Sequence, residues 1–289
     1  DNDGNDDLLV AAFSDDTGTS NSGTVYVGYG PMTSGTDMTA GNFDDLVYGT
    51  IASDAFGRVI RDLGDLDGDG LGSFASATYL NNGNTGIVYV YHNTVSGSIA
   101  DTDADLIITG EDASDYFGTA VAPLGGDLNG DGYDDFLVSA THDDLGGTDT
   151  GAVYVIPGDA TSDVVDMLYI AKIYGDVASG KFGSAVDGTG DYYGDHSYTQ
   201  GILVGANNQG TSTEGAVYLF LGPTTGSIAS TDAVAILEGT DPSDSMGSWV
   251  EFSGDLDGTG APAVLTCSNG SDLNGAGAGA GYVLFGVGE

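Results

Sequence analysis

Four short patterns recur in the same order along the whole chain, and this repetition limits the folds that the chain can adopt. A Phe-Gly pair is followed by a Gly-Asp pair, then by an aspartate-rich segment, and then by a Gly-x-Val-x-Val strand. The Gly-Asp pairs recur roughly every 63 residues, and they begin at Gly64, Gly126, Gly190 and Gly254. A fixed period of this kind indicates a repeat architecture, in which each copy packs against its neighbours. The period is longer than the 40 to 45 residues or so of a four-stranded WD-type propeller blade.

The other patterns place the copies in register. Phe-Gly pairs begin at Phe56, Phe117 and Phe182, with Met246-Gly247 as a variant. The Gly-x-Val strands begin at Gly23, Gly86, Gly151, Gly215 and Gly281. The intervening apolar runs are short, Gly, Asp, Ser and Thr separate them, and no helical period appears. In the copy from Phe117 we predict strands over 117–124, 135–141, 151–156 and 167–174.

Sheets of four antiparallel strands repeated in this way predict an all-β fold, a β-propeller of four-stranded antiparallel blades. About five repeats are present, over residues 1–50, 51–110, 111–175, 176–240 and 241–289. Because no linker interrupts them, we expect a single domain over residues 1–289. The first and last repeats are incomplete, and the innermost strand of the first repeat would have to come from elsewhere.

Two single residues have predicted places in this register. Trp249 stands in a first-strand position, and we expect it in the core. Cys267 is the only cysteine, so no disulfide framework exists. We expect it to be a small buried residue at the end of a strand, in the place held in other copies by Ala12, Ala77, Ala140 and Ala206.

The segment 124–141 contains the best-formed acidic loop. Acidic and amide side chains alternate in it, Gly132 stands at a tight turn, and an apolar strand follows. Calcium takes about six to eight oxygen ligands, and this spacing turns carboxylates inward while a backbone carbonyl supplies a further oxygen. We predict a calcium site whose ligands are Asp127, Asn129, Asp131, the carbonyl of Tyr133, and Asp135.

The other copies carry variants of this loop. In the first copy the predicted ligands are Asp1, Asp3, the carbonyl of Asn5, and Asp7. In the second they are Asp65, Asp67, Asp69 and Ser73. Because Ser73 stands in the place of an aspartate and brings no charge, we expect this site to bind calcium more weakly. The fifth copy keeps Asp255 and Asp257, but Thr259 and Ala263 replace the later ligands. Asp191 to His196 in the fourth copy lack the spacing. We expect about three good Ca²⁺ sites and one or two weak ones.

These residues carry a family resemblance over essentially the whole chain. The Phe-Gly start, the acidic loop, the small strand ends such as Val-Gly-Ala206, and the Gly-x-Val-Tyr-Val strand resemble FG-GAP repeats. Those repeats form the N-terminal propeller of integrin alpha chains and of prokaryotic relatives. The resemblance implies calcium loops between the first two strands of a blade, and ligands bound at one face of the propeller.

Charge restricts the partners. The chain has 44 acidic and four basic residues, for a net charge of −40. Such a surface repels nucleic acid and anionic lipid, so we exclude both as partners. No apolar run reaches the roughly 18 residues that could cross a bilayer, so we expect no membrane insertion. A large solvated negative charge favours a saline or calcium-rich setting, outside the cell or at its surface.

Catalytic interpretations are weaker. Gly175 to Phe182 nearly matches a phosphate-binding loop, but Phe182 replaces the required hydroxyl and no helix follows. His92, His142 and His196 lack the spacing of a transition-metal site. A Ser-His-Asp triad assembled across space stays open, and the clustered aspartates that a glycosidase would need are already explained as calcium ligands.

We therefore expect a protein that is not an enzyme: an extracellular calcium-binding propeller for adhesion, recognition or cell-surface scaffolding, in which calcium is structural. Its partners would be a protein or glycan ligand, or copies of itself. The alternative is a self-assembling subunit of an extracellular filament or surface layer, since strands missing at both ends could be supplied by a neighbouring copy. A propeller-fold hydrolase or lyase is the third choice.

Overall fold

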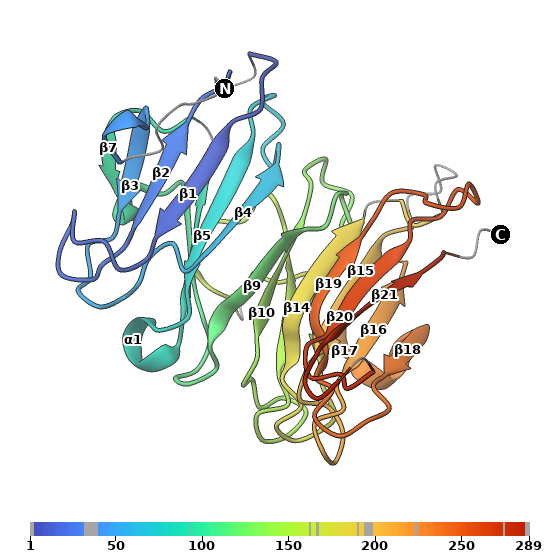
Figure 1. Ribbon diagram of the computed structural model, residues 1–289. Helices are drawn as coiled ribbons and strands as arrows, with labels where there is room; N and C mark the ends of the chain where they lie inside the picture. Colours follow the sequence, from blue (N-terminus) through green and yellow to red (C-terminus); the bar gives the residue numbers. More distant parts are fainter. Residues whose placement is uncertain are drawn as a thin grey trace.

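The computed structural model describes residues 3–31, 40–92, 94–161, 163–165, 168–189, 191–193, 199–222, 225–273 and 275–286. The strands of these described residues form five separate sheets, and most neighbouring strands in each sheet are antiparallel (Figure 1). The prediction of an all-β fold built from four-stranded antiparallel blades is confirmed.

The first blade contains β1 (Leu8–Ala12), β2 (Thr24–Gly28) and β3 (Asp45–Tyr48). The second contains β4 (Val59–Gly64), β5 (Ser73–Thr78), β6 (Ile87–Tyr91) and β8 (Leu106–Thr109). The third contains β9 (Phe117–Pro123), β10 (Phe136–Ala140), β11 (Ala152–Ile156) and β13 (Ala171–Tyr174).

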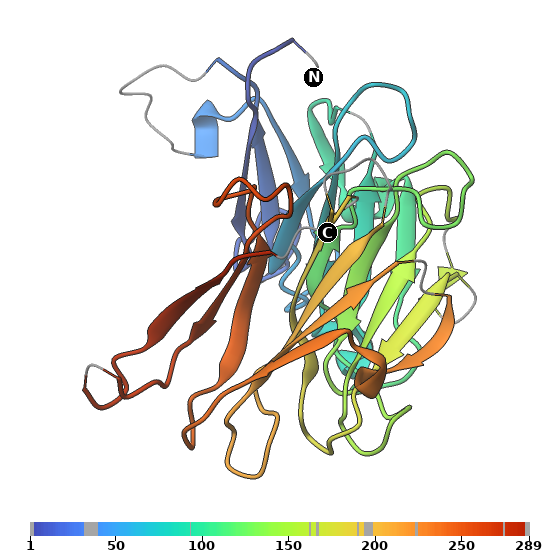
Figure 2. The same cartoon turned by 90° about the vertical axis from the view of Figure 1, so that its right-hand side faces the viewer.

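The fourth blade contains β14 (Phe182–Thr189), β15 (Gly201–Ala206), β16 (Ala216–Leu221) and β18 (Ala235–Glu238). The fifth contains β19 (Met246–Phe252), β20 (Val264–Ser268) and β21 (Ala280–Leu284). The first strands β4, β9, β14 and β19 lie side by side, so the sheets fan out from a common inner line (Figure 2).

Three further strands, which the sequence did not predict, link the blades. They are β7 (Ser98–Ala100), β12 (Asp163–Val164) and β17 (Gly226–Ala229). Each comes from the connection before the outer strand of its own blade, and pairs in parallel with the outer strand of the preceding blade: β7 with β3, β12 with β8, and β17 with β13. A repeated Gly-Ser-Ile-Ala segment, at 97–100 and 226–229, was the sequence signal for two of them.

Other boundaries also differ from the prediction. The strand predicted over 167–174 begins at Ala171, and Met167 lies outside the described residues. A single helical turn, α1 (Asn81–Asn84), follows β5, although no helix was predicted. Short 3-10 turns η1 (Ala40–Asn42), η2 (Asp101–Asp103) and η4 (Ser230–Asp232) precede β3, β8 and β18. These are turns between strands, and they leave the fold class unchanged.

The Phe-Gly pair and the glycine of the Gly-x-Val strand form one joint between blades. A Cβ atom added to Gly86, just before β6, would overlap the carbonyl oxygen of Phe117 in the next blade. The same overlap recurs between Gly23 and Phe56, between Gly151 and Phe182, and between Gly215 and Met246. Because the backbones pass so closely, any side chain at these glycines would push adjacent blades apart.

The fifth blade has a different register from the predicted one. Its equivalent glycine is Gly279, not Gly281, because the N–H of Gly279 donates to the carbonyl of Ser271 just as Gly151 donates to Asp143. Ser268 then lies opposite Ala280, as Ala140 lies opposite Ala152. The prediction failed because glycine occupies every second position from 275 to 281, which leaves the sequence pattern ambiguous.

The predicted place of Cys267 is therefore wrong by one residue. It corresponds to Ala11, Ala77, Ser139 and Gly205, while Ser268 and Thr78 take the strand-end position. This column must stay small where a blade follows: a Cβ on Gly57 would lie 3.1 Å from that of Ala11, and one on Gly183 would lie 2.7 Å from that of Ser139. Cys267 is a free thiol and only partly buried.

The core lies between successive blades. One apolar cluster joins blades 2 and 3 and includes Phe117 and Tyr154, and a second joins blades 3 and 4 around Phe182. Smaller clusters lie between blades 1 and 2 and between blades 4 and 5. Trp249 was expected in this core, but its side chain is 44% exposed. Its counterparts Ala120 and Ala185 pack against the cores that face the next blade, and no described blade covers β19 on that side.

Candidate metal centre

Three acidic loops share one backbone conformation. Each begins with an aspartate that caps its own turn, since the carboxylate accepts hydrogen bonds from the N–H groups three and five residues later. Asp127 accepts from Gly130 at 2.6 Å and from Gly132 at 2.8 Å. Asp65 and Asp255 make the same pairs of bonds, with Gly68 and Gly70 and with Gly258 and Gly260. The side chain of the first aspartate is thus held in one position in all three loops.

The glycines explain why these segments fold alike. Both glycines of each loop have positive φ, with values of 81° at Gly130 and 98° at Gly132. Residues with a Cβ adopt this region at a cost, so glycine is needed at both positions. The second glycine of the loop was predicted to stand at a tight turn, whereas the first, which stands at Gly68, Gly130 and Gly258, was not. The sequence signal for this first glycine was its position, three residues after the first aspartate of the loop.

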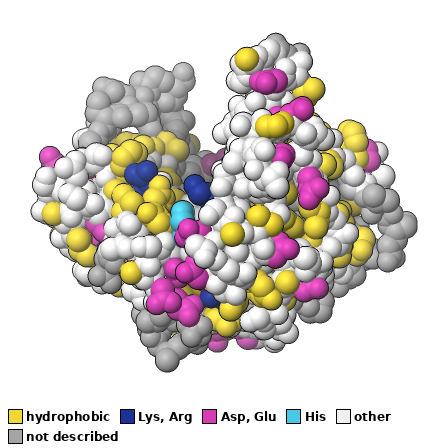
Figure 3. All heavy atoms as spheres, turned by 90° about the horizontal axis from the view of Figure 1, so that it is seen from below, with side chains coloured by type: hydrophobic (Ala, Val, Ile, Leu, Met, Phe, Trp, Pro, Cys, Tyr) yellow, Lys and Arg dark blue, Asp and Glu magenta, His cyan; other side chains and the backbone are white. Residues whose placement is uncertain are grey.

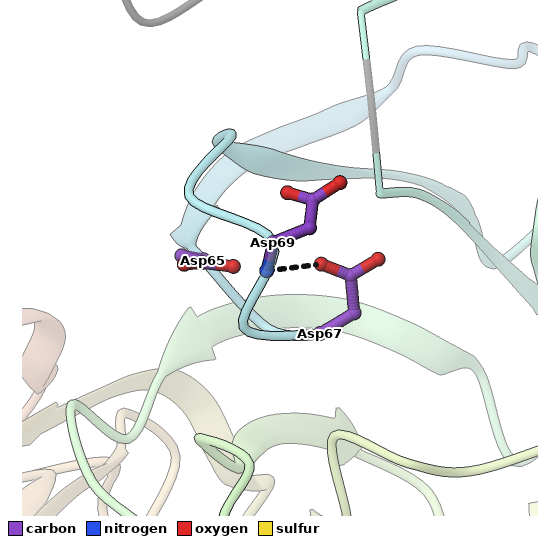
Figure 4. Close-up of side chains that lie close together, drawn as sticks. All are labelled: Asp65, Asp67 and Asp69. Carbon is purple, nitrogen blue, oxygen red and sulfur yellow. Dashed lines mark hydrogen bonds between the residues drawn. The ribbon is translucent and has the colours of Figure 1, made fainter.

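The loop between β4 and β5 brings three carboxylates together. One oxygen from each of Asp65, Asp67 and Asp69 lies within 4.8 Å of the others, and Figure 4 shows the three side chains gathered around one turn. The N–H groups of Asp69 and Leu71 donate to Asp67 and Asp69, which holds the turn closed. Such a cluster repels itself unless a cation or protons neutralise it.

Ser73, the fourth predicted ligand of this loop, is occupied by other contacts. Its hydroxyl oxygen accepts a hydrogen bond of 3.4 Å from the N–H of Leu66 and lies 3.4 Å from Nδ1 of His92. The side chain is buried at the start of β5. It therefore lies beside the acidic turn as part of the strand start, rather than projecting with the three carboxylates.

In the loop between β9 and β10, the predicted ligands form a chain of hydrogen bonds. The carboxylate of Asp131 accepts from the N–H of Tyr133 at 2.9 Å and from the amide of Asn129 at 2.6 Å. Asp135 is fully buried and accepts from the N–H groups of Leu128 and Gly158. The side chain of Gln200 in the next blade donates to the carbonyl of Asp127, a supporting contact that the sequence did not reveal.

Burial controls the acidity of Asp135. Desolvation raises its pKa to about 6, the two backbone hydrogen bonds oppose this rise, and repulsion from Asp131 and Asp127 adds to it. Desolvation also raises the pKa of Asp134, and the charges of Asp127 and Asp65 raise it further. The acidic loops of blades 2 and 3 therefore lie close enough to influence one another. A bound cation would reverse these effects by favouring the ionised carboxylates.

The remaining loops are partly described. Asp1 lies outside the described residues. Asp3 accepts from the backbone and side-chain amides of Asn5, while Asp7 accepts from the N–H of Gly30. In the fifth blade, Thr259 donates both its N–H and its hydroxyl to Asp257, in the place where other loops have a carboxylate. Asp195 and His196 of the fourth copy also lie outside the described residues.

The donor sets suit a hard divalent cation. Carboxylates, an amide and backbone carbonyls are the oxygen ligands that calcium takes. Each oxygen of Asp131 accepts one hydrogen bond and keeps a lone pair, whereas Oδ1 of Asp127 accepts two, from Gly130 and Asp131. The residues that would hold the ion are Asp65, Asp67 and Asp69 in one loop, and Asp127, Asn129, Asp131 and Asp135 in the next. The loops joining first to second strands lie together at the upper end of the molecule in Figure 1.

The negative charge extends beyond these loops. Figure 3 shows the end of the molecule opposite to them, where acidic side chains are scattered among hydrophobic ones and basic side chains are few. Arg58 lies over the rings of Phe13 and Tyr79, at 5.5 and 4.9 Å from their centroids. Among the described residues, no helix is long and apolar enough to cross a membrane.

The sheets, their joints and the acidic loops define an all-β repeat protein built from propeller-type blades. A family model for the FG-GAP repeat matches residues 117–156, which cover the third blade from β9 to β11 and its acidic loop. The chain thus carries an FG-GAP repeat in its third blade, and its blades resemble those of an integrin-like FG-GAP repeat protein.

Two relatives agree with this assignment. The chain is 30% identical over 197 residues to integrin alpha-5 of Xenopus laevis, which covers 64% of this chain and 18% of that protein. It is 31% identical over 169 residues to integrin alpha-V of Gallus gallus, which covers 57% of this chain and 15% of that protein. The chain therefore spans less than a fifth of the length of these relatives.

Proposed function

We propose that the protein is an extracellular recognition module in which structural calcium ions hold the acidic loops in shape. The observation that carries this proposal is the convergence of Asp65, Asp67 and Asp69 within 4.8 Å, on a turn whose conformation recurs in two other loops. The integrin relatives support the recognition role, which in this chain would be adhesion to a protein or glycan or the scaffolding of a cell surface. Calcium is not a catalyst in this proposal, and the protein is not an enzyme.

The proposal has a thermodynamic consequence. Three carboxylates held together repel each other when no ion is bound, so the empty loop destabilises the native state. An ion that binds only the folded loop adds about 2.7 kcal/mol to the free energy of unfolding when its concentration is 100-fold above Kd. Several loops on one molecule would add several such contributions.

The test is thermal unfolding in calcium and in chelator. We expect the Tm to fall by at least about 10 °C when excess EDTA replaces calcium, and to recover when calcium is restored. Magnesium at the same ionic strength is the control, because it prefers a smaller octahedral site and should restore less. An unchanged melting curve in EDTA would contradict structural calcium.

The recognition role needs its own measurement. Binding of the calcium-loaded protein to arrays of extracellular proteins and glycans should yield a ligand whose binding is lost in EDTA, since the loops would lose their shape. A charge-matched acidic protein is the control for non-specific attraction. Absence of any ligand on such arrays would argue against recognition while leaving the calcium result intact.

We also propose that residues 1–289 act as one domain. The same glycine joint links each pair of successive blades, and β7, β12 and β17 pair with the blade before their own. Stability should then be shared along the array, as in other repeat proteins. Calorimetry in calcium should show one cooperative transition, whereas two separated transitions would indicate two domains.

A further inference from the structure

A lysine and an aspartate are buried against each other in the third blade. Lys172 belongs to the outer strand β13, and Asp143 to the connection between β10 and β11. Nζ of Lys172 lies 2.7 Å from Oδ2 of Asp143, and the two side chains are only 6% and 3% exposed. An amine and a carboxyl group held this close and shielded from water are the two reactants of an amide bond.

The blade can be built without this lysine. Lys172 lies opposite Tyr154, and the residues opposite the equivalent tyrosines of blades 1, 2 and 4 are apolar: Leu46, Ile107 and Ile236. A buried ion pair is a weak source of stability, because the cost of removing two charges from water offsets their attraction. Stability of the ion pair alone therefore does not account for a lysine at this place.

The surroundings of Asp143 make its carboxyl carbon a better electrophile. The hydroxyl of Tyr154 donates to Oδ2 at 2.7 Å, and the N–H of Leu145 donates to Oδ1 at 2.9 Å. Both donors draw electrons away from Cγ. When an amine attacks this carbon, negative charge develops on an oxygen, and a fixed backbone N–H such as that of Leu145 stabilises it, as in an oxyanion hole.

A second carboxylate is placed to move the protons. Oε2 of Glu111 lies 3.0 Å from the same Nζ of Lys172. Burial opposes the charge of Lys172, but its hydrogen bonds to Asp143 and Glu111 outweigh this effect and raise its pKa. The lysine therefore rests as an ammonium, which is not a nucleophile. A base at hydrogen-bond distance from the nitrogen can remove its proton, and Glu111 holds this position.

We propose that Lys172 and Asp143 become joined by an isopeptide bond, which forms within the folded protein. Glu111 takes a proton from the ammonium, and the freed amine attacks Cγ of Asp143. The bond from Cγ to Oδ2 breaks, and Oδ2 leaves as water with the two protons that the nitrogen has lost, one of them returned by Glu111. Oδ1 becomes the amide oxygen on the N–H of Leu145. Ammonium and carboxylate thus give an amide and water, and no other reactant is needed.

The folded state favours this reaction in two ways. It holds the two groups in contact, which raises their effective concentration far above that of free groups in solution. The product is neutral, so the cost of keeping two charges buried disappears. The freshly folded chain contains the ion pair, and the bond forms afterwards. It ties the outer strand β13 to the connection after β10, independently of calcium.

The experiment follows the full chain by mass spectrometry after refolding in calcium and incubation for several days. Trypsin cuts after lysine and arginine, and it should lose its site at Lys172, so that residues 62–181 stay in one fragment lighter by one water molecule. Chymotrypsin should release a branched peptide that contains both Lys172 and Asp143. The chain kept unfolded in urea is the control and should keep its cut at Lys172, because only the fold holds the two groups together. Complete cutting at Lys172 after incubation of the folded chain would overturn the proposal.

Protein variants identify the reacting groups. Lys172→Arg keeps the charge but stays protonated, so it should lose no water at this site. Glu111→Gln removes the base and should slow the formation of the branched peptide at least about 100-fold. Asp112→Asn, at the exposed neighbouring position, is the matched control and should react as wild type does. A loss of water that Lys172→Arg retains in full would place the reaction elsewhere and overturn the proposal, and a wild-type rate in Glu111→Gln would overturn the step assigned to Glu111.

Discussion

The ammonium group of Lys172 lies 2.7 Å from Oδ2 of Asp143, and both side chains are buried inside the third blade. Lys172 also contacts Glu111 at 3.0 Å and lies over the ring of Tyr154, whose hydroxyl donates to Asp143 at 2.7 Å. The pairing of tyrosine with aspartate recurs in the first blade, where Tyr26 donates to Asp15. The lysine does not recur: Leu46, Ile107 and Ile236 hold its position opposite the equivalent tyrosines.

We predict that Lys172→Ile destabilises the protein by about 3–5 kcal/mol, because it leaves the carboxylate of Asp143 buried without a cation. Urea unfolding in calcium measures the loss. The double variant Lys172→Ile with Asp143→Asn should recover more than half of it, since an isoleucine is already tolerated at this position in two other blades and the amide can still accept from Tyr154. A double variant no more stable than the single one would show that packing of the lysine stem, and not its charge, matters.

The joint between blades gives a second prediction. Gly86→Ala should destabilise the protein by more than about 3 kcal/mol, because its Cβ would overlap the backbone of Phe117 and its φ of 89° already disfavours alanine.

Gly279→Ala is the matched control. Its φ is 75°, and its Cβ would lie no closer than 3.6 Å to any atom outside its neighbours. This variant should cost only the backbone strain of about 1 kcal/mol. Equal losses in the two variants, measured by urea unfolding, would mean that strain at glycine, rather than contact with the next blade, sets the requirement.

Much of the fold was readable because the repeat is made of local patterns. The acidic loops and the second and third strands lie close together in the chain, so spacing alone predicted them. The side chains of Asp65, Asp67 and Asp69 converge because alternate residues of one tight turn point to the same side. Their spacing in the sequence was therefore enough to predict the cluster. Their identity as calcium ligands stays a prediction.

The failures concern contacts between distant parts of the chain. Strands β7, β12 and β17 are two to four residues long and pair with the edge of another blade, so local propensity did not predict them. The repeated Gly-Ser-Ile-Ala segment was a signal for β7 and β17 alone. The sequence did not predict the buried partners of Lys172, because one of them, Glu111, lies 61 residues away along the chain. Trp249 was assigned to the core from its first-strand position, but that position is covered only where a further blade follows, and no described blade follows β19.

Asp115 gives a prediction about pH. Burial raises its pKa to about 7, with further contributions from Asp143 and Asp112, while Lys172 opposes the rise. The unfolded chain would release this proton near the ordinary value of 3.8. Between pH 4 and 7, in round numbers, the native state therefore holds a proton that the unfolded state has lost, and this site makes stability fall as pH rises.

Asp115→Asn removes this titration, and we expect the variant to gain stability relative to wild type as pH rises from about 4 to about 7. Urea unfolding of both proteins across this range, at saturating calcium, measures the difference between their free energies of unfolding. The titration of the acidic loops cancels in this difference, because both proteins contain the same loops. A constant difference at all pH values would mean that Asp115 ionises normally in the folded protein.

The ranking of the acidic loops can be tested with Asp131→Ala and Asp257→Ala. Asp131 stands in a loop whose other predicted ligands include the carboxylates of Asp127 and Asp135 and the amide of Asn129, and it fixes the turn by accepting from Tyr133. Asp257 stands in a loop where Asp255 is the other carboxylate and a threonine hydroxyl takes one of its oxygens. Fewer charged oxygens mean weaker binding of a hard cation. In calcium, Asp131→Ala should therefore lower the Tm several degrees more than Asp257→Ala.

In EDTA the gap between the two variants should shrink, because only the lost hydrogen bonds remain. A gap that is the same with and without calcium would place the effect in the turn itself, and equal losses in calcium would refute the ranking.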